Sequence, residues 1–215
     1  MADKLRLAVF VSGGGSNLQA ILDASAQPDY PVEVVCVVSN DPDAFGLERA
    51  RKSGVPALGV PHRGFASRED HDRAILMELG EYRPQAAALA GYMRIVTPVL
   101  IEFFRDRERG LPGLLNIHPA DTRAYQGAHG YEFALGMLPE HPQRLTQTKI
   151  TVHFVDAGMD TGPIIRQAPV EIRPEDSLDD LKARGLAVEH RLYPEVIRLY
   201  AEERILLRGK QVVIS

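Results

Sequence analysis

The chain has 215 residues, of which 45% are hydrophobic and 25% are charged, with a net charge of −4 at pH 7. This length and composition are typical of a globular protein with a core of its own, and they favour one large domain over two small ones. We expect neither a nucleic-acid nor a membrane partner, because the sequence has no run of lysine and arginine and no apolar stretch of the roughly 20 residues that a membrane helix needs.

The first predicted strand covers residues 5–11 and ends at three consecutive glycines. Only four residues precede it, without the pattern of a signal peptide, so we expect a cytoplasmic protein. Residues 12–17 lead from this strand into a helix. Such a junction binds phosphate, because glycines let the backbone approach an anion and the helix start offers free N–H groups. The glycine pattern matches neither the dinucleotide nor the nucleoside triphosphate motif, and a tight turn without a ligand is the alternative.

Strands and helices alternate from there to residue 117. We predict strands at residues 32–38, 56–60, 85–90 and 114–117, and helices at residues 44–52, 67–80 and 97–104. The single cysteine, Cys36, lies within a strand and cannot form an internal disulfide, which is compatible with a reducing cytoplasm. The alternation predicts an α/β fold with a doubly wound, mostly parallel, Rossmann-like sheet.

The pattern changes after Pro119. A long amphipathic helix is predicted over residues 177–208, with a break or kink at Pro194. We expect the strands of this C-terminal part to include antiparallel ones. The other predicted elements are an irregular loop at residues 120–130, a short helix at 132–138, a surface connection at 138–147, a strand at 149–155, a strand near 164–167 and a last strand at 211–214.

Three polar residues stand out as candidates for catalysis. Asn116 and His118 are two residues apart at the end of a buried strand, so both side chains point to the same side, where ligands bind in open α/β sheets. A carbonyl reaction needs these groups: an amide donor for an oxyanion, and an acid or base that titrates near neutral pH. Asp160 follows in a glycine-rich loop, and we expect its carboxylate to raise the pKa of His118 and keep the imidazole protonated.

The sequence offers neither a covalent nucleophile nor a metal-binding pattern. Cys36 is inside a strand, and no serine stands in the G-x-S-x-G pattern of a nucleophile elbow. The seven histidines lack the H-x-x-x-H and H-E-x-x-H spacings, so we expect no metal ion.

Five segments resemble the phosphoribosylglycinamide formyltransferases, also called GAR transformylases. They are residues 12–20, 45–50, 91–95, 116–119 and 159–163, and the resemblance extends from Leu7 to about Tyr193. N-x-H-P and D-x-G also occur in the wider formyltetrahydrofolate-dependent transferase family, whereas the glycine loop and F-G-L-E-R-A are more specific. The resemblance implies transfer of a formyl group from 10-formyltetrahydrofolate to the amine of glycinamide ribonucleotide, in de novo purine biosynthesis, through a tetrahedral oxyanion. It implies small-molecule substrates and a monomer or homodimer.

The resemblance also implies roles for individual residues and halves of the chain. It implies one formyltransferase domain over residues 1–215, with a phosphate-binding half at 1–110 and a catalytic, folate-binding half at 111–215. The implied catalytic residues are Asn116, His118 and Asp160, and the implied ribonucleotide contacts are Gly15, Ser16, Asn17 and Glu189. The implied folate contacts are Arg68, Met93, Arg94, Ile95, Val96, Asn116, Asp156, Ala157, Gly158 and Met159.

Residues 120–123 depart from the resemblance. They read Ala-Asp-Thr-Arg where the family usually has Ser-Leu-Leu-Pro, so two charges stand near His118 and the path of this loop stays open. Two other functions also stay open. One is another formyl-folate enzyme, either the hydrolase, expected to carry an extra N-terminal domain, or the methionyl-tRNA formyltransferase, expected to carry an extra C-terminal one. The other is a non-catalytic Rossmann-like protein that binds a phosphorylated ligand.

Overall fold

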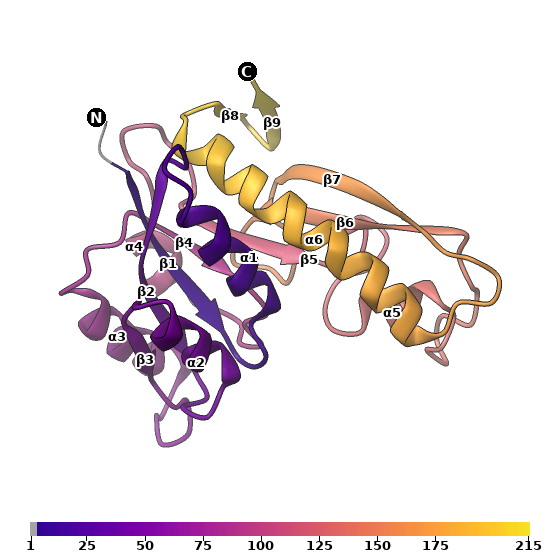
Figure 1. Cartoon of the computed structure of the whole chain (residues 1–215), viewed down its shortest axis with the longest axis horizontal. Coiled ribbons are helices and arrows are strands. Elements are labelled where there is room, and N and C mark those ends of the chain that lie inside the picture. The colour runs from indigo at the N-terminus through magenta and orange to yellow at the C-terminus, as the bar shows by residue number, and fades with distance from the viewer. Residues whose placement is uncertain (1–3) are drawn as a thin grey trace.

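The computed structural model describes residues 4–215, so residues 1–3 of the expected domain range lie outside the described residues. Seven strands form one sheet in the order β3-β2-β1-β4-β5-β6-β7 (Figure 1). Strands β1 to β5 pair in parallel, whereas β6 and β7 are antiparallel, which confirms the predicted sheet. The bounds are β1 (Leu5–Val11), β2 (Val32–Ser39), β3 (Ala57–Gly59), β4 (Ala86–Leu89), β5 (Leu114–His118), β6 (Gln147–Phe154) and β7 (Ile164–Glu171).

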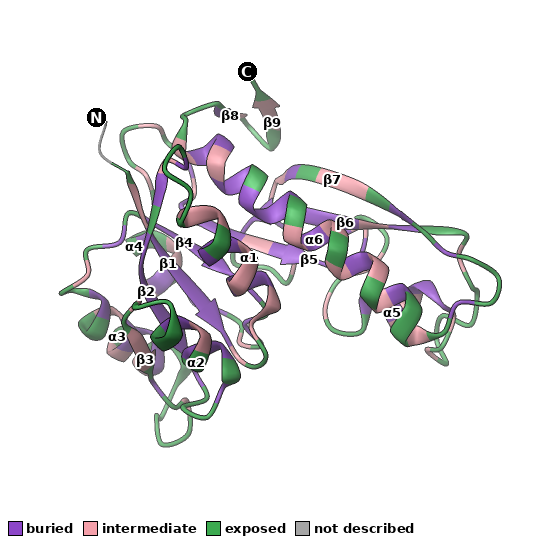
Figure 2. Ribbon diagram, viewed as in Figure 1, coloured by how far each residue is buried: buried purple, intermediate pink, exposed green. Residues whose placement is uncertain are grey.

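Helices cover both faces of this sheet, as the buried strands in Figure 2 require. In β1, Leu7 and Val9 pack with the helices of one face, whereas Ala8 and Phe10 pack with those of the other. Both sets are fully buried, which explains why the strand reads as a continuous apolar run. The first face carries α1 (Ser16–Ser25), α2 (Phe45–Lys52), α5 (Gly130–Ala134) and α6 (Leu178–Ala201), and the second carries α3 (Arg68–Leu79) and α4 (Pro98–Phe103).

The strand order reverses between β1 and β4. The chain moves outward from β1 to β2 and β3 and then returns to β4 on the other side of β1. At such a switch point the loops that follow the two strands diverge, and the crevice between them is where open α/β sheets bind ligands. Leu89 at the end of β4 pairs with Asn116 of β5, so the crevice lies directly beside the predicted catalytic strand.

The long helix α6 differs from its prediction in two ways. It runs without a break from Leu178 to Ala201, so the predicted break at Pro194 is wrong. Tyr193 explains this continuity: it is fully buried, and its hydroxyl donates to the backbone oxygens of Leu89 and Leu115. Packing on the sheet therefore outweighs the one backbone hydrogen bond that Pro194 removes.

The helix also ends earlier than predicted. It stops at Ala201, and the residues predicted to continue it form β8 (Ile205–Arg208), which pairs with β9 (Gln211–Ile214) in a separate two-stranded sheet. In Figure 1 this small hairpin lies beyond the end of α6. None of the helices within residues 4–215 is both long and apolar enough to cross a membrane.

Two boundaries in the C-terminal part also need correction. Helix α5 covers Gly130–Ala134 instead of residues 132–138, because Gly136 turns the chain with a φ of 69° against the backbone of residues 142–144. Strand β7 continues to Glu171 instead of ending at 167. It contains Pro169, which is tolerated because β7 is the edge strand of the sheet.

Candidate active site

The glycine loop forms one wall of a pocket at the switch point. Gly15, at a φ of 69°, occupies the left-handed region and is the N-cap of α1. The pocket has a volume of about 340 Å³, and Arg49 of α2 also contributes to its lining. The remaining lining residues are Ser12, Gly13, Gly14, Ser16 and Asn17 of the loop, and Ala90, Gly91 and Met93 after β4.

The helix that starts at this loop carries no acidic residue in its first turn. Helices α3 and α6 both have two acids there, which neutralise the positive end of the helix. The start of α1 is thus left with its free N–H groups and its dipole facing the pocket, as a phosphate requires. The structure brings the predicted residues Gly15, Ser16 and Asn17 together at this point.

Glu189 reaches the same loop from α6, 172 positions away from Asn17. Its Oε2 accepts a hydrogen bond of 2.6 Å from Asn17 Nδ2, and its Oε1 accepts one of 2.5 Å from the Tyr131 hydroxyl. Glu189 is 5% exposed. Burial raises the pKa of the Tyr131 hydroxyl, and the carboxylate of Glu189 raises it further. Both oxygens of Glu189 therefore bind the chain itself, and the residue fixes the side chain of Asn17.

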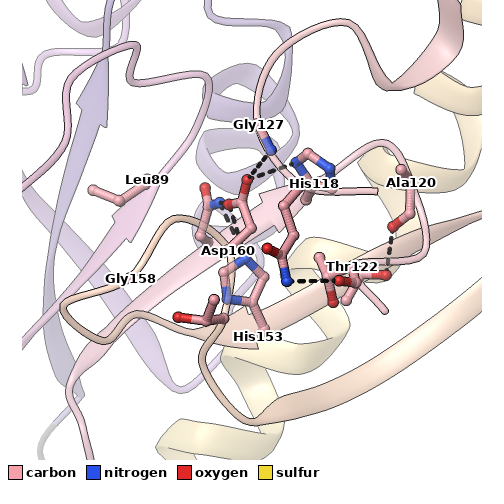
Figure 3. A network of polar contacts seen from close by, with 12 residues as sticks. Leu89, His118, Ala120, Thr122, Gly127, His153, Gly158 and Asp160 are labelled. Carbon is pink, nitrogen blue, oxygen red and sulfur yellow. Dashed lines mark hydrogen bonds and ion pairs between the residues drawn. The ribbon is translucent and has the colours of Figure 1, made fainter. Parts of the chain in front are cut away.

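The three predicted catalytic residues lie together at the end of β5: Figure 3 shows His118 beside Asp160, and a hydrogen bond joins Asn116 to the same carboxylate. Asn116 and His118 face the same side of the sheet, and the loop after β6 returns to place Asp160 over them. Asp160 Oδ1 accepts a hydrogen bond of 3.1 Å from Asn116 Nδ2. Asp160 Oδ2 accepts one of 2.9 Å from the backbone N–H of Gly127 and lies 3.4 Å from His118 Nδ1.

Asp160 is an ionised carboxylate held in an unusual backbone conformation. Its φ of 53° is uncommon for a residue with a side chain, and the contacts of the carboxylate hold it there. Burial alone would raise its pKa, but the contact with His153, the neighbouring His118 imidazole and the N–H of Gly127 lower the pKa to about 2. Asp160 is thus negatively charged over the whole working range of an enzyme.

His118 does not match the prediction of a protonated imidazole. It is 5% exposed, and burial lowers its pKa below the ordinary value by more than the Asp160 carboxylate raises it. The structure therefore corrects this expectation: in the free protein His118 is neutral near pH 7. Its Nδ1 faces Asp160, whereas its Nε2 is buried and has no hydrogen-bond partner among residues 4–215. A proton on Nδ1 leaves the Nε2 lone pair available to a substrate.

A second histidine, His153, completes the cluster, and the sequence analysis missed it. It lies on β6 directly opposite Asn116 and is 2% exposed. Its Nδ1 is 2.7 Å from the backbone oxygen of Phe154, which fixes the proton there, so Nε2 can accept from Asn116 Nδ2 at 3.2 Å. His153 Nε2 also lies 3.4 Å from Asp160 Oδ1. In the sequence, only the position of His153 in an alternating strand indicates which way its side chain points. The antiparallel pairing of β5 with β6 is also needed to place it opposite Asn116.

The loop after β4 places some of the predicted folate contacts beside this cluster. It leaves the sheet next to Asn116, and it exposes Met93 by 75% and Ile95 by 43%, as an apolar ligand surface would. Arg94 is half-buried between them. Val96 instead belongs to the core under α3 and α4, and Arg68 is an exposed residue at the start of α3, so these two do not join the cluster.

The loop that carries Asp160 is folded on itself. Asp156 Oδ1 accepts hydrogen bonds from the backbone N–H of Gly158 at 3.0 Å and from the Thr161 hydroxyl at 2.6 Å. Ala157, Gly158 and Met159 are exposed. The exposed residues stand beside Asp160 on the outside of the loop, where a bound molecule can contact them.

In residues 120–123, the segment that departs from the family pattern, the half-buried charge of Asp121 is paired. Asp121 accepts from Lys149 Nζ at 2.7 Å and from Gln167 Nε2 at 2.9 Å. These bonds lower the pKa of Asp121 although burial opposes them. The Thr151 hydroxyl donates to the backbone oxygen of Ala120 at 2.6 Å. The open question of the loop path is thereby answered, because partners on β6 and β7 fix the segment below His118.

Other reactive side chains contribute little to this site. Burial raises the pKa of the Cys36 thiol to about 12, so Cys36 is a protonated core residue. Within residues 4–215, no group of three histidine, cysteine or acidic side chains is arranged to hold a metal ion.

Comparison with known proteins adds independent findings. The formyl transferase family model matches residues 5–197. Phosphoribosylglycinamide formyltransferase of Escherichia coli is 40% identical over 201 residues, which cover 94% of this chain and 89% of that protein. The Haemophilus influenzae protein of the same name is 37% identical over 204 residues, covering 94% and 90%. The crystal structure of glycinamide ribonucleotide transformylase 1 from Symbiobacterium toebii is similar with a TM-score of 0.90 and 42% identity, covering 100% and 95%.

Proposed function

The chain belongs to the formyl transferase family, and on that premise we propose how its site works. It is an enzyme that transfers a formyl group from formyl-folate to the amino group of glycinamide ribonucleotide, in purine biosynthesis. The donor in our proposal is 10-formyltetrahydrofolate. The observation that carries the proposal is the cluster of Asn116, His118 and Asp160 at the end of β5, together with the pocket at the glycine loop of the same sheet.

We assign the two substrates to the two sides of the switch-point crevice. The ribose phosphate binds the N–H groups of Gly15, Ser16 and Asn17, and Glu189 orients Asn17. The folate lies against residues 93–95 and 156–159, whose exposed Met93, Ile95 and Met159 offer an apolar surface, whereas Val96 supports this surface from the core. Arg68 is exposed at the start of α3, and we assign its guanidinium to the carboxylates of the folate tail.

The chain works as one formyltransferase domain in this proposal. Residues 1–110 supply the phosphate site and part of the folate surface, and residues 111–215 supply the catalytic residues and the rest of the folate surface. The contact between Asn17 and Glu189 supports one domain, because it joins the two halves at the substrate itself. We further propose that the enzyme is cytoplasmic, works without a metal ion or nucleic acid, and is a monomer or homodimer.

The corrected charge of His118 determines the proton path. The substrate amine attacks the formyl carbon, and the carbonyl oxygen becomes a tetrahedral oxyanion. His118 Nε2 accepts a proton from the attacking amine, and Asp160 stabilises the resulting imidazolium through Nδ1. The imidazolium then gives this proton to the folate nitrogen as the carbon–nitrogen bond breaks, and the oxyanion collapses to the new formamide.

Asn116 stabilises the oxyanion. Its Nδ2 donates to Asp160 and to His153 in the free protein. We propose that one of these two hydrogen bonds is exchanged for one to the oxyanion when the formyl group binds. A preorganised donor of this kind is worth about 10²–10³ in rate. Holding both substrates in one crevice supplies proximity in addition.

Formyl transfer with competing acceptors tests this function. The enzyme is given 10-formyltetrahydrofolate together with glycinamide ribonucleotide, in water, with charged initiator tRNA also present. We expect the formyl group to appear on the ribonucleotide. Release of formate would instead support a hydrolase, formylation of the tRNA would support the related transferase, and no turnover would support a binding protein without catalysis.

A further inference from the structure

Helix α2 is attached to the glycine loop, and the mechanism above does not use this contact. The backbone N–H of Gly46 donates to the Gly13 oxygen at 2.9 Å, and Arg49 Nε donates to the Gly14 oxygen at 2.8 Å. Two consecutive carbonyls of the loop therefore bind α2. An anion is repelled by carbonyl oxygens and attracted by N–H groups, so these bonds keep the repulsive groups of the loop away from the pocket.

The glycines of both segments make this attachment possible. A Cβ at Gly15 would lie 2.8 Å from the Cα of Gly46, and a Cβ at Gly46 would lie 2.9 Å from Cγ2 of Val11. The two backbones are thus in direct contact: a side chain at Gly15 would require a shift of the loop or of α2, and one at Gly46 would require a shift of Val11. The F-G-L-E-R-A segment has its glycine and its arginine three residues apart, which places both on the side of α2 that faces the loop.

Arg49 is fixed in place by several partners. Its Nη1 donates to Gln19 Oε1 at 3.0 Å, and Gln19 Nε2 donates in turn to Asp23 Oδ1 at 2.8 Å. The guanidinium also lies over the ring of Phe45, 4.9 Å from the ring centre. The side chain is half-buried, and it carries the only charge among the described residues that line the pocket.

We propose that Arg49 is the positioning residue of the phosphate site. It holds the Gly14 carbonyl away from the anion and places its own positive charge at the rim, so the pocket favours a phosphate monoester over an uncharged sugar. This inference rests on the proposed function, because the ligand of the pocket is there the phosphate of the ribonucleotide. It adds a residue of α2 that acts through the loop.

Inorganic phosphate, titrated into the full-length protein, tests this role without any turnover. Binding is followed through the backbone amide resonances of Ser16 and Asn17. We expect Arg49→Ala to weaken phosphate binding at least tenfold, because a charge-assisted contact and the loop geometry are both lost. Arg49→Lys should fall in between, since a lysine keeps the charge but lacks the planar fork.

Arg51→Ala is the matched control. Arg51 lies on the same helix, is exposed and pairs with Glu48, so its loss removes an equal charge without touching the loop. We expect phosphate binding by this variant to stay within twofold of the wild type. An equal weakening in both variants would mean that only the general charge of the surface matters, and it would overturn the proposal.

Steady-state kinetics separate positioning from a general structural role. We expect Arg49→Ala to raise KM for the ribonucleotide about tenfold or more, with kcat and the KM for formyl-folate changed less than threefold. A similar fold-change in kcat, in the KM for the ribonucleotide and in the KM for formyl-folate would overturn the proposal. If Arg49→Ala does not fold, Arg49→Lys decides: a raised ribonucleotide KM at an unchanged thermal midpoint supports the proposal, and a wild-type KM overturns it.

The two proposals fail in different ways. The proposed reaction is contradicted if the wild-type protein binds phosphate at Ser16 and Asn17 but transfers no formyl group. In that case the phosphate titration of the Arg49 and Arg51 variants still decides the role of Arg49. Wild-type protein that transfers the formyl group, with phosphate affinity unchanged in Arg49→Ala, contradicts the role of Arg49 alone. If the wild-type protein does not bind phosphate, the proposed role of Arg49 is also overturned.

Discussion

The two ends of the crevice are built in different ways. The pocket to which we assign the phosphate comes mainly from one short stretch, residues 12–17, and it offers backbone N–H groups whose direction is fixed by glycines and by α2. The catalytic cluster draws on β5, β6 and a separate loop, and it depends on buried side chains that surround one carboxylate, Asp160. A backbone site tolerates the loss of one contact, whereas a charged cluster depends on each member. Substitutions should therefore have larger effects at the catalytic end.

The largest effect is expected from Asp160→Asn. The amide cannot stabilise the imidazolium that forms on His118, so kcat should fall about 10³-fold or more while the fold survives. Steady-state formyl transfer and circular dichroism measure the two quantities. Asp106→Asn, at a half-buried position and paired with Arg109, is the control and should keep its activity. Near-normal kcat in Asp160→Asn would remove the carboxylate from the mechanism.

Gly15→Ala should have the next largest effect, at the phosphate end. The alanine would have to adopt the left-handed backbone conformation, and its Cβ would lie 2.8 Å from the Cα of Gly46, so the loop must shift. We expect KM for the ribonucleotide to rise about 10²-fold, with a smaller change in kcat. Gly54→Ala has a similar φ of 71° but open space around it, and it should lower stability without changing KM. A wild-type KM in Gly15→Ala would contradict the assigned loop geometry.

A smaller effect, about tenfold in kcat, is expected from His153→Ala. Asn116 loses the acceptor that orients its amide, and Asp160 loses a neighbour. His153 also lowers the pKa of His118, so the midpoint of the pH–rate profile should move to higher pH in this variant. A purely structural role would change the unfolding temperature and leave that midpoint in place. His141→Ala, on an exposed turn, is the control and should behave as the wild type.

The smallest effect concerns the sheet that supports both ends. Tyr193→Phe removes a buried hydroxyl that donates to Leu89 of β4 and Leu115 of β5, so the free energy of unfolding should fall by about 1 kcal/mol. Urea denaturation measures this change. Tyr82→Phe, at a half-buried position, should change stability by less than half as much. Equal losses in the two variants would mean that the hydroxyl of Tyr193 has no particular role.

The same contrast explains how much the sequence predicted. The glycine turn before α1 and most helices and strands of the first half are local patterns, such as the Ser67 cap with Asp70, and their structure is confirmed. Asn116 and His118 were paired correctly because they share one strand. His153 was missed because only the antiparallel register of β6 places it opposite Asn116.

The errors come from tertiary structure. The charge of His118 was wrong because its burial exceeds the effect of the neighbouring carboxylate, and burial is a property of the whole fold. The break at Pro194 was wrong because the packing of Tyr193 against the sheet overrides a local helix breaker. Both errors concern residues whose environment is assembled from distant parts of the chain.

The central claim is that His118 starts the reaction as a neutral base whose Nε2 is free and whose Nδ1 is held by Asp160. Its pKa lies below the ordinary value of 6.5, so His118 gains its second proton only as the pH falls below that value. The most direct test is a nitrogen-15 NMR titration of the His118 imidazole in the free protein between pH 5 and 8. We predict a single proton on Nδ1 at pH 7, a midpoint below 6.5, and a lower midpoint still in Asp160→Asn. An imidazolium that persists at pH 7, with a midpoint above 6.5, would contradict the account.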